Sequence, residues 1–339
     1  MVASGGTAAR NHRPKIGRAR KGFLLAAFGF GVVGLAVYAV TELARQHEAG
    51  VAFVPKRWVD LDAPQRPSSL GVATMSPQRG LLRVAIAPVI SPEKSFERYR
   101  EFVGFLAERL QRTPECQQRG SYAEVNELVR YNRCELAIVC TCAFIQGERE
   151  FGMEPLVVPV IDGQTQYHSL VLVPSTSQAE SLLDLRGRRF ASGDILSTSG
   201  WLFPAVWLVQ HGEDPESFFG EHIFTGSHDR SVSAAASAYV DGTAVHSQVY
   251  SQMLEEDPSI GLKTRVILKS PPYGEPPFVV PRALDPKLKE LLRTVMLTMH
   301  TDPEGEKVLA PLHIDRFVLP DDDLYDTVRE LSKLWEERG

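Results

Sequence analysis

The chain has 339 residues, of which 43% are hydrophobic and 23% are charged. This composition is typical of a folded protein long enough for two domains, and it excludes a disordered chain or a coiled coil. The net charge is −5, and residues 1–21 carry +6 of basic charge with no acid, which leaves −11 for the rest. An acidic body argues against a nucleic-acid-binding protein, because binding to the phosphate backbone requires a basic surface.

A run of 20 uncharged residues, 22–41, follows the basic head. At about 1.5 Å per residue, a helix of this length spans roughly 30 Å and can cross a bilayer once. The positive charge before the run predicts that residues 1–21 stay in the cytoplasm and residues 42–339 lie outside. A cleaved signal peptide is the main alternative, and a buried core helix is a further one.

Three glycines within this run, Gly29, Gly31 and Gly34, match the G-x-G-x-x-G pattern of dinucleotide-binding turns. That pattern must follow a strand and begin a helix in a βαβ unit, so its place inside an apolar span excludes this interpretation. Residues 42–80 contain many prolines and glycines and show little periodicity, which predicts a tether between the span and the body.

From residue 81 onward, short apolar strands alternate with amphipathic helices. The predicted strands are 82–87, 115–118, 135–141, 156–160, 169–174, 189–191, 222–224, 243–245, 264–268 and 277–280. The predicted helices are 96–110, 122–131, 201–210, 232–240, 286–300, 304–309 and 323–337. Such alternation indicates parallel sheets covered by helices on both faces.

The pattern predicts an α/β fold with two lobes. Lobe 1 comprises residues 81–172 and 275–339, and lobe 2 comprises residues 173–274. The strands 169–174 and 277–280 are expected to cross between the lobes. Ligands of such folds bind in the crevice beyond the carboxyl ends of the strands, especially between lobes.

Three consecutive hydroxyl residues, Ser197, Thr198 and Ser199, lie between a predicted strand and a predicted helix. Pro204 places the start of that helix within a few residues of Ser199, because proline is tolerated only in the first helical turn. Free N–H groups, the helix dipole and the hydroxyls favour an anion there. An ordinary Ser/Thr N-cap is the structural alternative.

Two further turns between a strand and a helix offer hydrogen-bond donors. His228 follows Gly226 and Ser227 and can donate to an anion, although a lone histidine is as often structural. Tyr122 follows Gly120 and Ser121 and contributes a phenolic hydroxyl. These positions complete a set of candidate anion donors at the ends of three strands.

Residues 82–331 resemble the phosphate-, phosphite- and phosphonate-binding proteins of ABC importers. The segments that carry the resemblance are RGSYAEVNELV, ELAIVCTCAF, DLRGRRFASGDILSTSGWLFP, GEDPESFFGEHIFTGSHDRSV, KSPPYGEPPFVVP and LHIDRFVLPDDDLYD. The resemblance implies a type 2 periplasmic-binding-protein fold whose two lobes close on the ligand. It also implies that Ser197, Thr198 and Ser199 hold the ligand oxygens, together with Tyr122 and His228.

The chain departs from the family pattern at two places. Many members have Thr-Gly-Ala-Tyr where this chain has Thr141-Cys142-Ala143-Phe144, which keeps Thr141 as a candidate ligand residue but loses a phenol. Many members have Asp where this chain has His246. A neutral imidazole accepts only weakly from an amine, so a more anionic ligand such as phosphate is expected to suit His246 better, unless this residue is structural.

Two other chemistries are disfavoured. No G-x-S-x-G elbow or triad spacing supports a serine hydrolase. The cysteines at 116, 134, 140 and 142 contain no C-x-x-C pair, which argues against zinc. A disulfide is the expected alternative outside the cytoplasm. It would join Cys116 to one of the other three, since Cys134 and Cys140 flank one strand about 20 Å long.

The sequence therefore predicts a solute-binding protein, with no catalysis and no cofactor, that captures phosphate, phosphite or phosphonate for an ABC permease. It is expected on the periplasmic side of the inner membrane, held by residues 22–41 or secreted if that segment is cleaved. The alternative function is a membrane-anchored module that senses a ligand and reports to a signalling partner.

Overall fold

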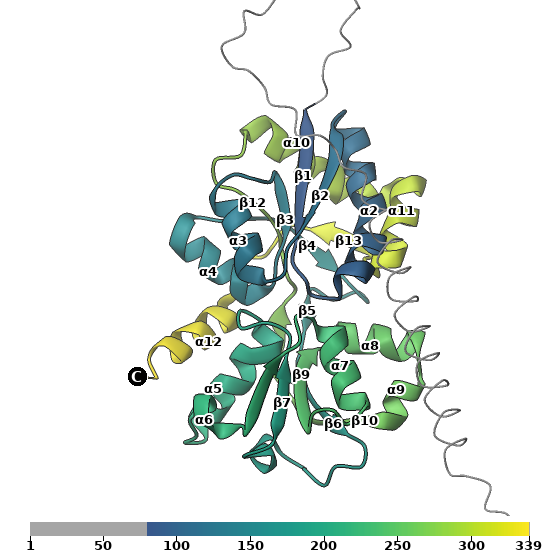
Figure 1. Cartoon of the computed structure of the whole chain (residues 1–339). Coiled ribbons are helices and arrows are strands. Elements are labelled where there is room, and N and C mark those ends of the chain that lie inside the picture. The colour runs from purple at the N-terminus through teal and green to yellow at the C-terminus, as the bar shows by residue number, and fades with distance from the viewer. Residues whose placement is uncertain (1–79, 339) are drawn as a thin grey trace, which may run out of the picture. The chain divides into compact units, whose positions relative to one another are not determined.

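The computed structural model describes residues 80–338. These residues form two α/β lobes, each built on one mixed sheet (Figure 1). The sheet of lobe 1 has the strand order β13-β4-β12-β3-β1-β2, and that of lobe 2 has the order β10-β6-β9-β7-β8. The predicted two-lobed α/β architecture is confirmed.

The membrane predictions concern a different part of the chain. Within residues 80–338, no helix combines the length and the apolar character that a membrane crossing requires. The basic head at 1–21, the span or signal at 22–41 and almost all of the tether at 42–80 lie outside the described residues, and these assignments stay predictions.

In lobe 1 four strands run in one direction and two run against them. The four are β1 (Leu81–Ile86), β2 (Thr113–Gln118), β3 (Leu136–Ile138) and β4 (Glu154–Val160). The two are β12 (Phe278–Val280), which pairs antiparallel with β3 and β4, and β13 (Arg316–Val318), which pairs antiparallel with β4. The helices are α2 (Pro92–Arg109), α3 (Tyr122–Arg130), α4 (Thr141–Phe151), α10 (Pro286–Thr298), α11 (Pro303–Leu309) and α12 (Asp326–Glu336).

Successive residues of β1 point to opposite faces of this sheet and therefore enter different cores. Leu82 and Val84 pack with residues of α2, α10 and α11. Ala85 packs with residues of α3 and α4 on the other face, and Figure 1 shows α2 and α11 on one side of the sheet and α3 and α4 on the other. Burial on both faces explains why the strand is an almost continuous apolar run.

Lobe 2 is organised in the same way. Its strands are β6 (Ser169–Pro174), β7 (Arg189–Ser192), β8 (Glu221–Phe224), β9 (Gly242–His246) and β10 (Thr264–Lys269). Its helices are α5 (Phe203–Gln210), α6 (Pro215–Phe218), α7 (His228–Ala236), α8 (Ser247–Glu256) and α9 (Ser259–Lys263). Short helical turns are η1 (Leu182–Leu185) and η2 (Thr198–Leu202) in lobe 2, and η3 (Met299–Thr301) and η4 (Ala310–Leu312) in lobe 1.

The chain crosses between the lobes through two short strands. β5 (Gln166–Tyr167) pairs antiparallel with β11 (Tyr273–Gly274). The strands expected to cross do not do so: 169–174 pairs along its length with β9 and β10 in lobe 2, and 278–280 pairs with β3 and β4 in lobe 1. The expected boundary between residues 172 and 173 thus falls inside β6.

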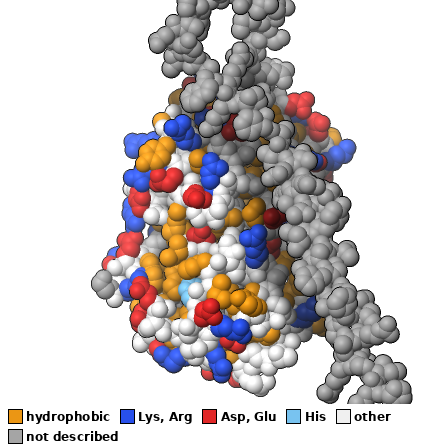
Figure 2. All heavy atoms as spheres, viewed as in Figure 1, with side chains coloured by type: hydrophobic (Ala, Val, Ile, Leu, Met, Phe, Trp, Pro, Cys, Tyr) orange, Lys and Arg blue, Asp and Glu red, His pale blue; other side chains and the backbone are white. Residues whose placement is uncertain are grey.

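Both lobes contribute to one continuous surface. Helix α12 belongs to the end of the chain and packs on α4 of lobe 1 as well as on α5 of lobe 2 (Figure 1). Figure 2 shows charged side chains of both signs over both lobes, with hydrophobic side chains gathered along the middle of this face. The apolar band thus lies where the two lobes meet.

Several element boundaries differ from those expected. The strand predicted at 135–141 ends at Ile138, and Thr141 already begins α4. The helix predicted at 232–240 begins earlier, at His228. The helices α4 and α8 were not predicted at all. At α4 the N-cap is Cys140, whose side chain makes no capping hydrogen bond, so the usual start signal is missing.

The four cysteines carry free thiols, so the expected disulfide of Cys116 does not form. Cys116 packs against the core on the β1 face that holds Leu82. Cys134, Cys140 and Cys142 belong to the core on the opposite face of the same sheet. The sheet separates Cys116 from all of its candidate partners.

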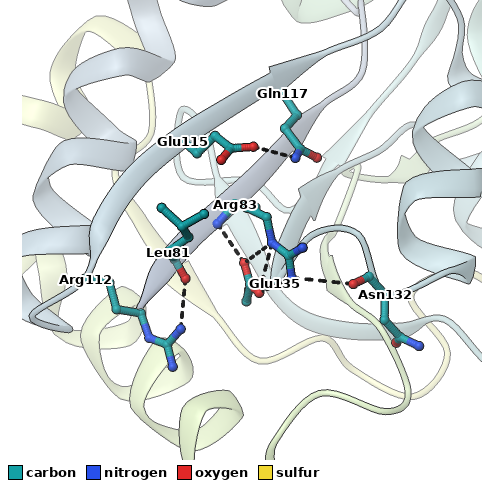
Figure 3. Close-up of polar contacts among 7 residues, drawn as sticks. All are labelled: Leu81, Arg83, Arg112, Glu115, Gln117, Asn132 and Glu135. Atoms are coloured by element: carbon teal, nitrogen blue, oxygen red, sulfur yellow. Dashed lines mark hydrogen bonds and ion pairs between the residues drawn. The ribbon is translucent and has the colours of Figure 1, made fainter. Parts of the chain in front are cut away.

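An ion pair fixes the end of the lobe 1 sheet at which β1 and β3 begin (Figure 3). Arg83 Nη2 lies 2.5 Å from Glu135 Oε1, and the Arg83 backbone N–H donates to Glu135 Oε2 at 2.7 Å. The hydrogen bond to Glu135 raises the pKa of Arg83. Both carboxylate oxygens of Glu135 are therefore engaged, at the end of the sheet opposite to the crevice.

Candidate functional site

The candidate site is built around the turn that follows β7. Ser197 precedes η2, a π-helical turn that continues into α5. Its hydroxyl accepts a hydrogen bond from the Gly200 N–H at 3.0 Å, as an N-cap does. A Cβ at position 200 would lie 2.9 Å from this hydroxyl, so the tight turn requires glycine. Ser197, Thr198 and Ser199 are all fully buried.

The turns after three strands of lobe 1 meet the turns of lobe 2 through hydrogen bonds. These bonds run from the His228 N–H to Val89 O at 3.0 Å, from the Tyr122 N–H to Asp194 Oδ2 at 3.0 Å, and from the Cys142 N–H to Thr198 Oγ1 at 2.8 Å. The N-termini of α3, α4, α7 and η2 therefore converge between the lobes. Converging helix N-termini favour negative charge, because their dipoles and N–H groups point toward the same place.

Four buried polar atoms at this junction have no hydrogen-bond partner within residues 80–338. They are Tyr122 Oη, Tyr167 Oη, Ser199 Oγ and His228 Nδ1. The other ring nitrogen of His228 lies 3.4 Å from Ser197 Oγ. Because an unpaired buried polar atom costs free energy comparable to a lost hydrogen bond, four of them around one turn indicate that a ligand completes their bonding.

None of these four side chains is charged near neutral pH. Burial lowers the pKa of His228 to about 4, against a smaller opposing effect of Asp229. Burial raises the pKa of Tyr122 and of Tyr167 well above 10, while the neighbouring hydroxyls of Ser197 and Thr198 act in the opposite direction. An anion would therefore be held by hydroxyl and N–H dipoles and not by an ion pair.

His246 joins this site from the end of β9. Its ring stacks on Tyr167 with centroids 3.8 Å apart and lies 6.0 Å from the ring of His228. Its Nδ1 accepts from the Gln248 N–H at 3.3 Å, and its Nε2 lies 3.7 Å from Glu275 Oε2. Burial and the neighbouring His228 lower the pKa of His246 well below 6.5, so this side chain is neutral as well.

Glu275 is a buried acid that sequence analysis did not identify. It is 2% exposed, and its Oε1 has no hydrogen-bond partner among the described residues. Burial raises its pKa well above 4.5, with a smaller opposing effect of Gln248. The raised pKa makes the protonated form, which can both donate and accept a hydrogen bond, more accessible to Glu275 than to an exposed glutamate.

His246 and Glu275 also line a cavity of about 90 Å³ between the lobes. Most of its other walls are apolar, formed by residues such as Ile90, Ile138 and Phe278. At one side Arg98 donates to Gln252 Oε1 at 2.8 Å. His246 and Glu275 thus lie between the turn at residues 197–200, called the anion turn below, and a small, mainly apolar space.

The structure brings six of the seven predicted site residues to one place: Tyr122, Ser197, Thr198, Ser199, His228 and His246 surround the same junction. Thr141 lies at its edge, where its hydroxyl donates to Gly274 O at 2.9 Å and so holds β11. Phe144 packs on Tyr325 with ring centroids 5.0 Å apart. The contribution of the seven predicted residues to ligand binding stays a prediction.

Three residues of this site escaped sequence analysis: Tyr167, Asp194 and Glu275. Asp194 lies directly before the hydroxyl run, and its two oxygens accept from the N–H groups of Tyr122 and Leu196. That position was the available signal for Asp194. Tyr167 and Glu275 lie in the crossing segments, where no local pattern marks a site.

Two α/β lobes that meet over converging helix N-termini and unpaired donors define a periplasmic-type ligand-binding protein. Residues 84–325 match the sequence profile described as "ABC transporter, phosphonate, periplasmic substrate-binding protein". The chain belongs to this family, whose members are substrate-binding transport proteins and not enzymes. The predicted family is confirmed.

Two relatives illustrate the similarity. The probable ABC transporter phosphite-binding protein PhnD1 of Prochlorococcus marinus (strain MIT 9301) is 27% identical over 165 residues, which cover 47% of this chain and 56% of that protein. The phosphonates-binding periplasmic protein of Escherichia coli (strain K12) is 25% identical over 223 residues, which cover 64% of this chain and 66% of that protein. The chain thus matches between half and two thirds of the length of these relatives.

Solved structures show the same fold. A binding protein component of an ABC phosphonate transporter from Pseudomonas aeruginosa has a TM-score of 0.72 at 22% identity, covering 77% of this chain and 88% of that one. The PhnD1 protein of Prochlorococcus marinus in complex with methylphosphonate has a TM-score of 0.68 at 21% identity, covering 76% and 98%. At this identity the likeness concerns the fold alone.

Proposed function

We propose that this protein binds a phosphorus oxyanion between its lobes and delivers it to an ABC importer. The observation that carries the proposal is the set of unpaired buried donors, Tyr122, Tyr167, Ser199 and His228, around the Ser197 turn. Family membership supports the transport role. The bound state requires no chemistry on the ligand, so no residue is assigned a catalytic role.

A tetrahedral oxyanion suits this arrangement because its oxygens need donors from several directions. The phenols come from lobe 1 and from a crossing strand, and the Ser199 hydroxyl and the imidazole come from lobe 2. A ligand held in this way links the two lobes and stabilises their closed arrangement. An analogue with a different number of protons would leave a buried donor or acceptor unpaired, which is a strong basis for selectivity.

Among the phosphorus oxyanions, we propose a phosphonate with a small substituent on carbon. The cavity beyond His246 and Glu275 offers about 90 Å³ of mainly apolar space for that substituent. The Asp of other members is replaced here by His246, and this replacement alone predicts phosphate instead of an amine-bearing phosphonate. Glu275, whose Oε2 lies 3.7 Å from His246 Nε2, supplies a carboxyl at the same place, so the replacement no longer argues against a phosphonate.

The partner and location follow from the family and not from the geometry. We propose that residues 80–338 act in the periplasm with an ABC permease, and that residues 22–41 anchor or export them. Purified protein loaded with ligand should stimulate the ATPase activity of the cognate permease complex in proteoliposomes. Equal stimulation by free and loaded protein would contradict the importer role.

Calorimetry on the full chain tests the ligand class directly. We expect methylphosphonate and aminoethylphosphonate to bind more tightly than phosphate or phosphite, and sulfate to bind weakly or not at all. Failure of every phosphorus ligand to bind at millimolar concentration would overturn the proposed function. Tighter binding of phosphate than of either phosphonate would overturn only the assignment of the cavity.

A substitution at position 246 tests how the ligand substituent is recognised. His246→Asp places a second carboxyl beside Glu275, and two adjacent carboxyls bind a cationic amine better than one. We expect aminoethylphosphonate affinity to rise relative to methylphosphonate. The exposed His211 serves as control, since His211→Asp should leave the ratio unchanged. An unchanged ratio in His246→Asp would show that this position does not face the substituent.

A further inference from the structure

Two backbone carbonyls of the anion turn lack their usual helical donors. In η2 the Phe203 N–H donates to Thr198 O, one residue further back than in an α-helix, and so does not serve Ser199 O. Pro204 has no N–H, so it cannot donate to Ser199 O at the π spacing or to Gly200 O at the α spacing. Neither carbonyl can accept from position 204, which leaves both open to donors from outside the helix.

Two buried serines on the neighbouring strands provide these donors. The Ser169 hydroxyl, at the start of β6, donates to Ser199 O at 2.6 Å. The Ser192 hydroxyl, at the end of β7, donates to Gly200 O at 2.7 Å. Both serines are fully buried. Neither is a candidate site residue from the sequence, and both act on backbone carbonyls of the turn.

The Ser192 hydroxyl is itself held by a histidine. His222 Nε2 lies 2.8 Å from Ser192 Oγ. Since the single Ser192 proton is used on Gly200 O, the imidazole must donate in this contact and the serine oxygen accepts. The result is a chain of hydrogen bonds from His222 on β8 through Ser192 on β7 to the turn.

The hydroxyls of Ser169 and Ser192 act on Ser197 through the peptide groups whose carbonyls they hydrogen-bond. In a trans peptide the C=O and the following N–H point in opposite directions. Ser169 holds Ser199 O, and the N–H of the same peptide, that of Gly200, donates to Ser197 Oγ. Ser192 holds Gly200 O, and the N–H of that peptide, that of Trp201, donates to Ser197 O at 3.0 Å.

We propose that Ser169 and Ser192 are positioning residues that orient the anion turn through the carbonyls freed by the π-turn and Pro204. They fix Ser197 on both its hydroxyl and its carbonyl, and with it the direction of the neighbouring Ser199 hydroxyl. This inference rests on the proposed function for its effect on affinity, whereas its effect on the geometry of the turn is independent of any ligand.

Variants of the full chain test the proposal against a matched control. The changes are Ser169→Ala and Ser192→Ala, and the control is Thr243→Val, which removes a fully buried hydroxyl that donates to a strand carbonyl, Ala191 O, at 2.9 Å. We expect similar shifts of the urea midpoint for all three. Methylphosphonate affinity should fall at least tenfold in the two serine variants and less than twofold in the control.

Hydrogen–deuterium exchange without ligand provides the second readout. Peptides that contain the Gly200 and Trp201 amides should exchange at least tenfold faster in Ser169→Ala and Ser192→Ala, and at the wild-type rate in Thr243→Val. Unchanged exchange in the serine variants, or an affinity loss no larger than that of the control, would overturn the proposal. Faster exchange in a protein whose wild type binds no phosphorus anion would overturn the proposed function alone.

Pro204→Ala supplies a test that does not remove either serine. It restores an N–H at position 204 that can donate to Gly200 O in place of Ser192. We expect the affinity loss caused by Ser192→Ala to shrink at least threefold in the Pro204→Ala background, since the two changes act on the same carbonyl. Equal losses in both backgrounds would show that the Gly200 carbonyl does not transmit the effect.

Discussion

The two ends of the lobe 1 sheet differ in whether their buried polar groups have hydrogen-bond partners. Where β1 and β3 begin, Arg83 and Glu135 are charged, and both carboxylate oxygens have partners. At the other end of the sheet, Tyr122, which follows β2, and His228, whose N–H donates to Val89 O after β1, are neutral and keep unpaired atoms. The same sheet thus has a satisfied pair that stabilises the fold at one end and an unsatisfied set that awaits a ligand at the other.

The comparison teaches that incomplete hydrogen bonding, and not charge, marks the functional end of this sheet. The charged pair is the more conspicuous feature of the structure, yet both of its carboxylate oxygens already have partners. The neutral end is destabilised by its unpaired atoms, and a ligand can recover that free energy on binding. Substitutions at the two ends should therefore have separable effects on stability and affinity.

The largest expected effect is the acid sensitivity of the neutral end. The folded-state pKa of His228 is about 4, below the unfolded value near 6.5, so the unfolded chain binds this proton first. Stability from this residue is complete above pH 6.5 and is lost as the pH falls toward 4, by roughly 3 kcal/mol. His222, also with a pKa of about 4, acts in the same direction.

Urea unfolding of the ligand-free protein at pH 7 and at pH 4.5 measures this loss. His228→Gln should lose less stability between the two pH values than the wild type does, because the glutamine does not titrate. Glu275, whose pKa is raised, contributes with the opposite sign in both proteins, so the difference reports His228 together with its effect on the pKa of His246. Parallel losses in the two proteins would contradict the assignment.

The second effect separates affinity from stability at the neutral end. Tyr122→Phe removes a hydroxyl that has no hydrogen-bond partner among residues 80–338, so the free energy of unfolding should stay within about 0.5 kcal/mol of the wild-type value. Ligand affinity should fall about 10- to 100-fold, the usual cost of one hydrogen bond to a charged group. Calorimetry measures the affinity, and Tyr131→Phe, at an exposed position, is the control.

The third effect is the converse at the charged end. Arg83→Met leaves the Glu135 carboxylate buried without its cation, and we expect a loss of about 1–3 kcal/mol in the free energy of unfolding. Ligand affinity should be unchanged once the protein is folded. Arg112→Met removes a single exposed hydrogen bond to Leu81 O and should cost far less. A loss of ligand affinity in Arg83→Met that matches its loss of stability would contradict the separation of the two effects.

The smallest effect concerns ion pairs that bridge the lobes at the surface. Glu256 of lobe 2 accepts from Lys94 at 2.7 Å and from Arg98 at 2.6 Å, both on α2 of lobe 1. Because exposed pairs contribute about 1 kcal/mol or less, Glu256→Gln should weaken ligand binding no more than about fivefold.

The salt dependence of this effect distinguishes bridging pairs from ordinary ones. The difference between Glu256→Gln and the wild type should vanish at high salt, since exposed pairs are screened. Glu290→Gln breaks a pair with Arg293 inside one helix of lobe 1 and should leave affinity unchanged. An equal effect of the two substitutions would show that bridging the lobes is irrelevant to binding.

Much of the fold could be predicted because local periodicity decides it. The strand expected at 82–87 and the helix expected at 122–131 differ from β1 and α3 by about one residue. Helix α4 escaped because Thr141, Cys142 and Ala143 continue the apolar run of the preceding strand. Only its tertiary packing, with Ala143 and Phe144 buried in the core, establishes this segment as a helix.

The residues of the site also fall into those that a local pattern predicts and those that only tertiary pairing brings together. Ser197, Thr198 and Ser199 could be predicted because a strand, a hydroxyl run and a proline follow each other within a few residues. Glu275 reaches His246 only through the antiparallel pairing of β5 with β11, which joins segments about a hundred residues apart. No local pattern in the Pro-Tyr-Gly-Glu-Pro segment reveals that pairing. Ser169 and Ser192 escaped for the same reason.

The neutrality of the anion turn has a consequence for the protein as a whole. Since burial keeps the pKa of His228 at about 4, this side chain takes up no proton near neutral pH to cancel the charge of the ligand, and the loaded protein carries that charge in addition to its own acidity. Free and loaded molecules therefore differ in net charge although no side chain has titrated. Anion-exchange chromatography should resolve the two forms and allow occupancy to be counted without any label.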